Sequence, residues 1–209
     1  MTAPDHDALD RDAQAHDGLA RLAERRVLHG IPTTVVNTRP DIATADVFER
    51  LDAALDLIET HTPHYFRHIR RDFAGLHVER YACRGAFFPA QRICLVELTF
   101  IVNRGFTLAQ VASTIVHEGM HARLHALGVE AESRAREERF CRRAEIEFGS
   151  LAPGGEPVVE RALAAMAGSD DEVAPLIDPV LAQRRIAEVD RAAAGPHWLR
   201  AALGRRGNG

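Results

Sequence analysis

The segment His117-Glu118-Gly119-Met120-His121 constrains this chain more than any other, because it has the pattern His-Glu-x-x-His. In a helix, His117 and His121 lie four residues apart, so their imidazoles leave the same face about one turn from each other. That spacing suits two ligands of one tetrahedral Zn²⁺ ion. Glu118 is rotated by about 100° from His117. Its carboxylate therefore lies beside such a metal, where it can accept a proton from coordinated water.

The pattern is short, and a surface helix with incidental histidines would also contain it. The surrounding residues argue against that alternative. Residues 113–116 carry no charge, and neither do Gly119 and Met120 between the two histidines. The segment therefore predicts a largely buried helix. A buried His-Glu-His group is costly unless a metal or hydrogen bonds satisfy it, so we interpret the pattern as a metal site.

Both ends of this helix can be predicted from the sequence. Thr107 and Gln110 form a capping box at its start, and Gly128 supplies a C-terminal stop. The predicted helix is about twenty residues and about 30 Å long. A second helix is expected at about residues 132–148, so the two helices form a hairpin with its turn at residues 128–131.

Residues 107–148 resemble the active-site region of the zincin metallopeptidases. The resemblance implies a small α+β domain in which a short, mostly antiparallel sheet packs on the motif helix. Arg123 departs from the pattern, because the superfamily usually has an apolar residue two places after the second histidine. The metzincin subgroup is excluded, because it requires a glycine and a histidine where this chain has Leu124 and Leu127.

The gluzincin arrangement, to which the chain is more similar, takes the third zinc ligand from a glutamate of the following helix. In the antiparallel hairpin, His121 is level with Glu138, which lies within the buried arc of the second helix. We therefore expect His117, His121 and Glu138 to bind the metal. Glu137 borders that arc and is the alternative ligand. His125 lies about 12 Å along the helix axis from His117, so it is expected on the surface or behind a ligand.

Glu145 shares the helix face of Glu138 about two turns further on. It is expected either to support a metal ligand from behind or to be a buried partner for an arginine. The alternative for this helix is a solvated face on which acidic side chains pair with neighbouring arginines, namely Arg134, Arg139, Arg142 and Arg143.

The remaining elements are predicted from periodicity and from helix start signals. They are an N-terminal helix within residues 1–26, an extended segment at 27–37, helices beginning near 44 and at 63, strands at 76–83 and 92–102 joined by a loop at 84–89, and helices at 157–167, 179–194 and 196–203. We expect a single zincin-like domain over residues 1–209, with its core at about 27–153 and a C-terminal helical extension from 154. By the same resemblance, strand 92–102 is the candidate edge strand for an extended peptide, although an ordinary core strand is an alternative.

Composition excludes several classes of protein. All 26 basic residues are arginine, which excludes a P-loop lysine and a pyridoxal Schiff base. The net charge of −4 gives no reason to expect nucleic acid as a partner, and no run of eighteen apolar residues predicts a membrane helix. Residues 1–17 lack the basic start and apolar core of a signal peptide, and three cysteines suit free thiols, so we expect a cytoplasmic protein.

Cys83 and Cys94 flank the predicted hairpin and are interpreted, with Cys141, as thiols rather than as a disulfide. The sequence thus predicts one Zn²⁺ per chain and a zinc-dependent hydrolase, with a peptide or protein as substrate. Zn²⁺ would polarise the scissile carbonyl and lower the pKa of bound water to about 7, and Glu118 would pass that proton to the leaving amine.

Two alternatives to the peptidase are open: a non-peptidase hydrolase that uses the same site, and a metal-stabilised binding or regulatory module without catalysis. The group that stabilises the oxyanion is not identified. Its candidates are Tyr65, Tyr81, His77 and His197, together with several arginines.

Overall fold

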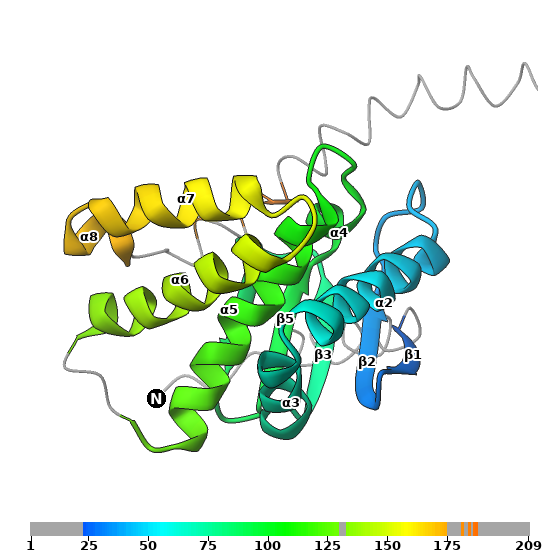
Figure 1. Ribbon diagram of the computed structural model, residues 1–209. Helices are drawn as coiled ribbons and strands as arrows, with labels where there is room; N and C mark the ends of the chain where they lie inside the picture. The colour runs from blue at the N-terminus through cyan, green and yellow to red at the C-terminus, as the bar shows by residue number, and fades with distance from the viewer. Residues whose placement is uncertain (1–22, 130–132, 175–180, 182–183, 185, 188–209) are drawn as a thin grey trace, which may run out of the picture. The chain divides into compact units, whose positions relative to one another are not determined.

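The computed structural model describes residues 23–129, 133–174, 181, 184, 186 and 187, which fold into an α+β arrangement of one mixed sheet and helices (Figure 1). The strands are β1 (Ala23–Leu28), β2 (Ile31–Val36), β3 (Gly75–Glu79), β4 (Gly85–Phe88) and β5 (Ile93–Glu97). The helices are α2 (Thr44–His61), α3 (Pro63–Asp72), α4 (Leu98–Val102), α5 (Leu108–Ala126), α6 (Arg134–Leu151), α7 (Glu156–Ala167) and α8 (Asp170–Val173).

The sheet has the strand order β1-β2-β3-β5-β4. Its three inner strands, β2, β3 and β5, are parallel, and the outer strands β1 and β4 are antiparallel to their neighbours. The prediction of a mostly antiparallel sheet is therefore wrong. The physical reason is that α2 and α3 lie between β2 and β3 in sequence, and such a crossover returns the chain in the same direction.

The predicted N-terminal helix is wrong for its last residues, because residues 23–26 belong to β1. His29 and Gly30 both have positive φ, at 50° and 82°, and form the tight turn between β1 and β2. That turn folds residues 23–28 back onto β2 as an antiparallel strand. The rest of the predicted helix, up to residue 22, lies outside the described residues.

The predicted strand at residues 92–102 is also wrong in its second half, where α4 follows β5 directly. The Glu97 carboxylate accepts a hydrogen bond from the Phe100 backbone N–H at 2.7 Å and another from the Thr99 hydroxyl at 2.7 Å. Arg80 pairs with the same carboxylate. Glu97 therefore acts as a helix cap, which ends the strand.

The segment predicted as a loop at residues 84–89 contains β4, which pairs antiparallel with β5. Because β4 lies at the end of the strand order, the sheet edge beside α5 is β4, and β5 is an interior strand. The expectation that residues 92–102 form this edge is therefore corrected: the edge belongs to β4.

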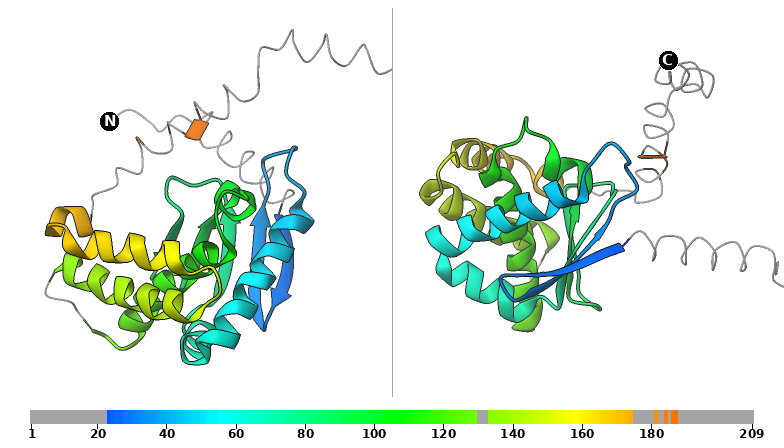
Figure 2. Two further views of the ribbon diagram at one scale, coloured as in Figure 1. Left: turned by 45° about the horizontal axis from the view of Figure 1, so that its top comes forward. Right: turned by 90° about the vertical axis from the view of Figure 1, so that its right-hand side faces the viewer.

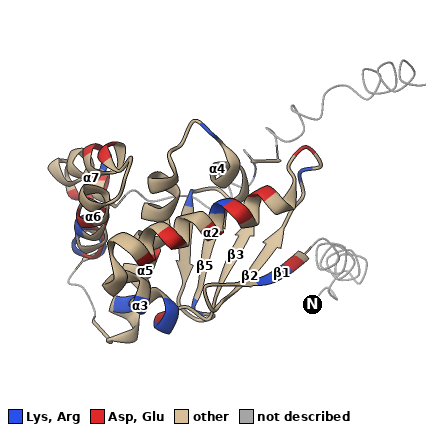
Figure 3. Ribbon diagram, turned by 45° about the vertical axis from the view of Figure 1, so that its right-hand side comes forward, with Lys and Arg blue, Asp and Glu red and all other residues tan. Residues whose placement is uncertain are grey.

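Helices α2, α3 and α5 pack together, and α6 and α7 continue the helical layer beyond α5 (Figures 1 and 2). The predicted apolar stripe of α2 is buried throughout, at Val47, Phe48, Leu51, Ala54, Leu55 and Ile58. Acidic residues recur along the same helix, and basic residues gather on α3 (Figure 3). Gly119 allows α3 to approach α5, because a Cβ atom there would lie only 2.7 Å from Ile69 Cγ1.

The chain divides into a unit of residues 1–175 and a C-terminal segment of residues 176–209. Helices α7 and α8 belong to the first unit, so the predicted extension from residue 154 is split between the two. In the segment, residues 181, 184, 186 and 187 are helical, and the helix predicted at 196–203 lies outside the described residues. None of the described helices is long and apolar enough to cross a membrane.

Candidate metal centre

Helix α5 begins at the capping box that the sequence predicts. The Thr107 hydroxyl accepts from the Gln110 N–H at 3.2 Å, and the Gln110 side chain accepts from the Thr107 N–H at 2.9 Å. From this start the helix runs between α2, α3 and α6, and residues 111–119 are buried. His117 and His121 project from α5 toward α6, which starts at its own cap, Ser133.

The two imidazoles of α5 converge on one point together with a carboxylate of α6. His117 Nε2 and His121 Nε2 are 3.2 Å apart. Glu138 Oε2 lies 3.2 Å from His117 Nε2, and Glu138 Oε1 lies 3.5 Å from His121 Nε2. Two nitrogens bound to a tetrahedral zinc ion at 2.0–2.1 Å would be roughly 3.3–3.4 Å apart. The spacing of these three side chains therefore fits a zinc ion at their centre.

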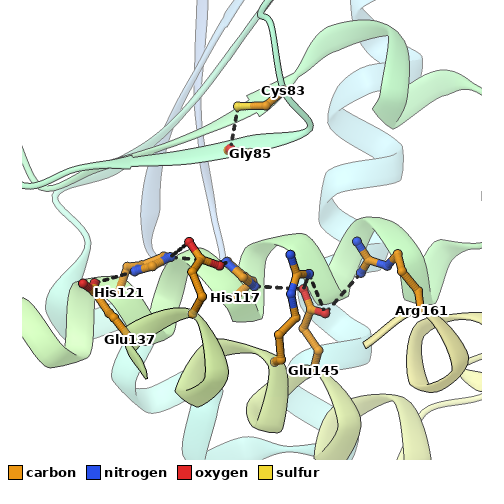
Figure 4. A network of polar contacts seen from close by, with 9 residues as sticks. Cys83, Gly85, His117, His121, Glu137, Glu145 and Arg161 are labelled. Carbon is orange, nitrogen blue, oxygen red and sulfur yellow. Dashed lines mark hydrogen bonds and ion pairs between the residues drawn. The ribbon is translucent and has the colours of Figure 1, made fainter. Parts of the chain in front are cut away.

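The other nitrogen of each imidazole is held by a second carboxylate (Figure 4). Glu145 Oε1 lies 2.9 Å from His117 Nδ1, and Glu137 Oε1 lies 2.7 Å from His121 Nδ1. An ionised carboxylate can only accept, so each Nδ1 carries a proton, and each Nε2 faces Glu138, where it can bind a metal as part of a neutral ring or hold a second proton. Two nitrogen lone pairs and a carboxylate that face one another repel, and a cation or protons between them relieve the repulsion.

The glutamates of α6 thus fall on two sides of the histidine pair. Glu138 is on the Nε2 side of both rings, where a shared ion would lie. Glu137, the alternative third ligand, is on the Nδ1 side of His121. His125 is exposed, with its ring 6.1 Å from the Phe87 ring of β4. This arrangement favours Glu138 over Glu137 as a metal ligand.

Glu145 both holds His117 and pairs with arginines. Its side chain is buried, and its two oxygens each lie 3.1 Å from the Arg142 guanidinium. Arg161 of α7 approaches the same carboxylate at 3.4 Å and also donates to the Ser113 hydroxyl at 3.4 Å. Glu145 therefore both contacts a histidine from behind and is the buried partner of arginines, which were the two roles expected for it. Arg161 was missed by the sequence analysis, because no local pattern links α7 to α5.

Glu118 lies under the edge strand β4. Its side chain is buried, and it makes no hydrogen bond or ion pair with another described residue. A Cβ atom at Gly85 would lie 3.0 Å from Glu118 Oε1 and 2.5 Å from Thr114 Cγ2, so only glycine allows β4 to lie this close. The sequence analysis missed Gly85, because it predicted residues 84–89 as a loop and the close approach depends on β4 packing on α5.

Burial and neighbouring charges set the pKa values of this site. Burial raises the pKa of Glu118 above its usual value. For His117, burial alone would lower the pKa, but the interactions with Glu138 and Glu145 outweigh it and raise the pKa to about 10. Burial would also lower the pKa of His121, but its interactions with Cys141, Glu137 and Glu138 outweigh burial and raise it. Burial would raise the pKa of Glu138, but its interactions with the two histidines outweigh burial and lower it. Protons therefore compete with a metal for the Nε2 atoms, so metal binding is expected to release protons.

Cys141 is a further side chain at this site that the sequence analysis did not assign to it. It is fully buried on α6, and its Sγ and one nitrogen each of His117 and His121 all lie within 4.8 Å of one another. The signal was present as Glu138-x-x-Cys141, one turn of the same helix. Cys83 and Cys94 are free thiols, as predicted, and so is Cys141.

The candidates for stabilising an oxyanion have other contacts or lie outside the described residues. The Tyr65 hydroxyl donates to Glu147 at 2.7 Å, and a ring nitrogen of His77 lies 3.3 Å from Glu79. The Tyr81 ring packs edge-on against Phe88. His197 belongs to the residues that the structure does not describe.

Arg123, the departure from the zincin pattern, lies 3.8 Å from the buried Asp72 carboxylate of α3, which Arg71 also holds. Arg123 therefore links α5 to α3 on the side away from the metal ligands. Comparisons of the chain with protein-family models, with curated proteins and with solved structures found no match.

Proposed function

We propose that the chain is a zinc-dependent hydrolase of the zincin type, and that its substrate is a peptide or protein. One observation carries the proposal. The Nε2 atoms of His117 and His121 converge at 3.2 Å beside Glu138, and each Nδ1 is held by a separate carboxylate. Carboxylates that orient metal-binding histidines in this way are typical of zinc sites. A surface helix with incidental histidines has no reason to align two imidazoles with three carboxylates.

A zinc ion bound to these residues supplies a Lewis acid that polarises a carbonyl and lowers the pKa of water. The chain supplies the base. Glu118 is the carboxylate in this site that no hydrogen bond or ion pair engages within the described residues. Because burial raises its pKa, the carboxylate is a better proton acceptor near neutral pH than an exposed glutamate. It takes the proton of the attacking water and delivers it to the leaving amine.

The position of β4 supports a peptide as the substrate. β4 is an edge strand, pairs with β5 on one side, and packs on α5 so closely that a Cβ atom at Gly85 would lie 3.0 Å from Glu118 Oε1. An extended peptide can add to such an edge through backbone hydrogen bonds, which are independent of side chains. A peptide on β4 would have its backbone beside the general base.

A second candidate function is a metal-stabilised binding module without catalysis. The proximity of Cys141 favours it, because four protein donors can fill a tetrahedral site and leave no position for water. The two functions differ in turnover and agree in metal content, so both quantities have to be measured.

The test compares wild-type protein, purified without chelator, with Glu118→Gln. We expect one zinc per chain in both, turnover of an unfolded protein substrate such as casein by the wild type, and a loss of at least about 100-fold in Glu118→Gln. The matched control is Glu147→Gln, which changes a half-exposed carboxylate of α6 on the side facing Tyr65. This control should keep both zinc and turnover.

Each other result has a defined meaning. Equal turnover in Glu118→Gln would remove Glu118 from the mechanism. Bound zinc without turnover of any peptide would favour the binding module. Protein without metal, whose histidines bind no added zinc, would contradict both functions.

A further inference from the structure

Cys141 is a buried group beside the proposed metal site that the proposed hydrolysis does not use. Helix α6 presents Glu138, Cys141 and Glu145 on one face at intervals of three and four residues. Glu138 and Glu145 both contact His117 from that face. Cys141 lies between them in the helix, fully buried, with its Sγ within 4.8 Å of ligand nitrogens of both histidines. The thiol is thus directed at the histidine pair, on the side where α6 packs on α5.

We propose that Cys141 is a fourth protein ligand of the metal, which closes the site at rest. This inference rests on the proposed metal site at His117, His121 and Glu138. On binding, the Cys141 thiol releases its proton to solvent, and the sulfur lone pair forms the bond to the metal in place of water. The reverse exchange, in which water returns and sulfur takes up a proton, opens the site for hydrolysis.

The charge and surroundings of the site favour this ligand. A divalent ion with two neutral histidines and one carboxylate has a net charge of +1, and a thiolate makes it neutral. A neutral centre is less costly to keep in a buried site, and both His117 and Cys141 are buried. Thiolate is also a soft ligand, which selects zinc over Mg²⁺ and Ca²⁺. Cys94 is buried equally well, but it lies in β5 and is not part of the histidine group.

The experiment replaces zinc with Co²⁺ in the full-length protein and records the absorption spectrum. Co²⁺ in a tetrahedral protein site gives d–d bands in the visible range, and a thiolate ligand adds a charge-transfer band in the near ultraviolet. We expect wild-type protein with one equivalent of Co²⁺ to show both. Cys141→Ser should lose the near-ultraviolet band and keep the visible bands. Cys83→Ser and Cys94→Ala, the chain's other two cysteines, are matched controls that should keep both.

The outcomes separate this inference from the metal site on which it rests. Visible bands without the near-ultraviolet band in the wild type would overturn the role of Cys141 and leave the metal site standing. A near-ultraviolet band that persists in Cys141→Ser would also overturn it, because another thiol would be the source. No visible bands in the wild type would remove the metal site itself. Where Cys141→Ser prevents folding, a near-ultraviolet band that persists in both Cys83→Ser and Cys94→Ala assigns the thiolate to Cys141, and its loss in either variant overturns the inference.

Discussion

Two groups of side chains in the described residues lie close enough together to hold a cation, and they differ in almost every physical respect. The first lies between α5 and α6 and consists of His117, His121 and Cys141, with Glu138 facing both histidines. The second lies on the surface, where His29 of the β1–β2 turn meets three carboxylates of α2. Its Nδ1 is 3.0 Å from Glu59, and its Nε2 is 3.4 Å from both Asp52 and Asp56.

The comparison teaches that the number of nearby donors does not identify a metal site. Both ring nitrogens of His29 lie within 3.4 Å of the carboxylates around it, so these carboxylates already have a partner. Those carboxylates are 50–67% exposed, and water serves them as well. In the buried group, the Nδ1 atoms contact Glu145 and Glu137, and the two Nε2 atoms lie 3.2 Å apart beside Glu138. The buried group therefore needs protons or a cation at its centre, and the surface group does not.

The largest expected effect is the loss of metal from the buried group. His117→Ala and Glu138→Ala should each weaken zinc binding by more than about 100-fold, since outer partners alone account for 10- to 100-fold. His29→Ala should keep one zinc per chain at unchanged affinity. The measurement is metal content after gel filtration, followed by titration against a chromophoric chelator. If His117→Ala retains zinc and His29→Ala loses it, the surface group and not the buried group is the metal site.

The buried group could be predicted from sequence to a large extent because its determinants are local. The motif fixes two side chains on one face of α5, the capping box fixes where that helix begins, and Gly128 limits the turn. Given an antiparallel hairpin, counting residues brings Glu138 level with the histidines. The contacts of Glu138 with both rings follow that register.

The missed features depend on contacts between distant segments. Gly85 matters only because β4 lies on α5, and Arg161 only because α7 returns over Ser113. Leu98, Phe100 and Ile101 are apolar and buried in a short helix, and such a run fits a strand equally well when only its periodicity is considered. The surface group at His29 was not predicted, because it depends on the β1–β2 turn docking on α2.

An intermediate effect is expected where the orienting carboxylate of the buried group is neutralised. Glu145→Gln should weaken zinc binding by about 10- to 100-fold, because His117 loses the group that fixes its ring. It also leaves Arg142 and Arg161 without their buried carboxylate, so the unfolding free energy should fall by about 3–5 kcal/mol. Urea unfolding and the chelator titration measure the two effects separately.

The matched change in the surface group is Asp56→Asn. It should change the free energies of zinc binding and of unfolding by no more than about 1 kcal/mol each, because exposed ion pairs contribute little. Glu147→Gln on α6 controls for the loss of any carboxylate from that helix. If Glu145→Gln binds zinc as tightly as the wild type, the orientation of His117 does not depend on this carboxylate.

The smallest effect should come from the double change Asp56→Asn and Glu59→Gln, which removes two of the three carboxylates around His29. The pairs lie at 3.0–3.4 Å, but their carboxylates are at least half exposed, so water screens them. Removing two acids also relieves their repulsion of each other and of Asp52. We expect the unfolding free energy to change by less than about 1 kcal/mol, and most of that change to disappear in about 1 M salt, where the screening length is about 3 Å. Thermal unfolding of the same double variant in the His117→Ala background, with and without one equivalent of zinc, completes the test. If zinc raises the unfolding temperature of His117→Ala but not that of the combined variant, then His29 and its carboxylates bind the ion.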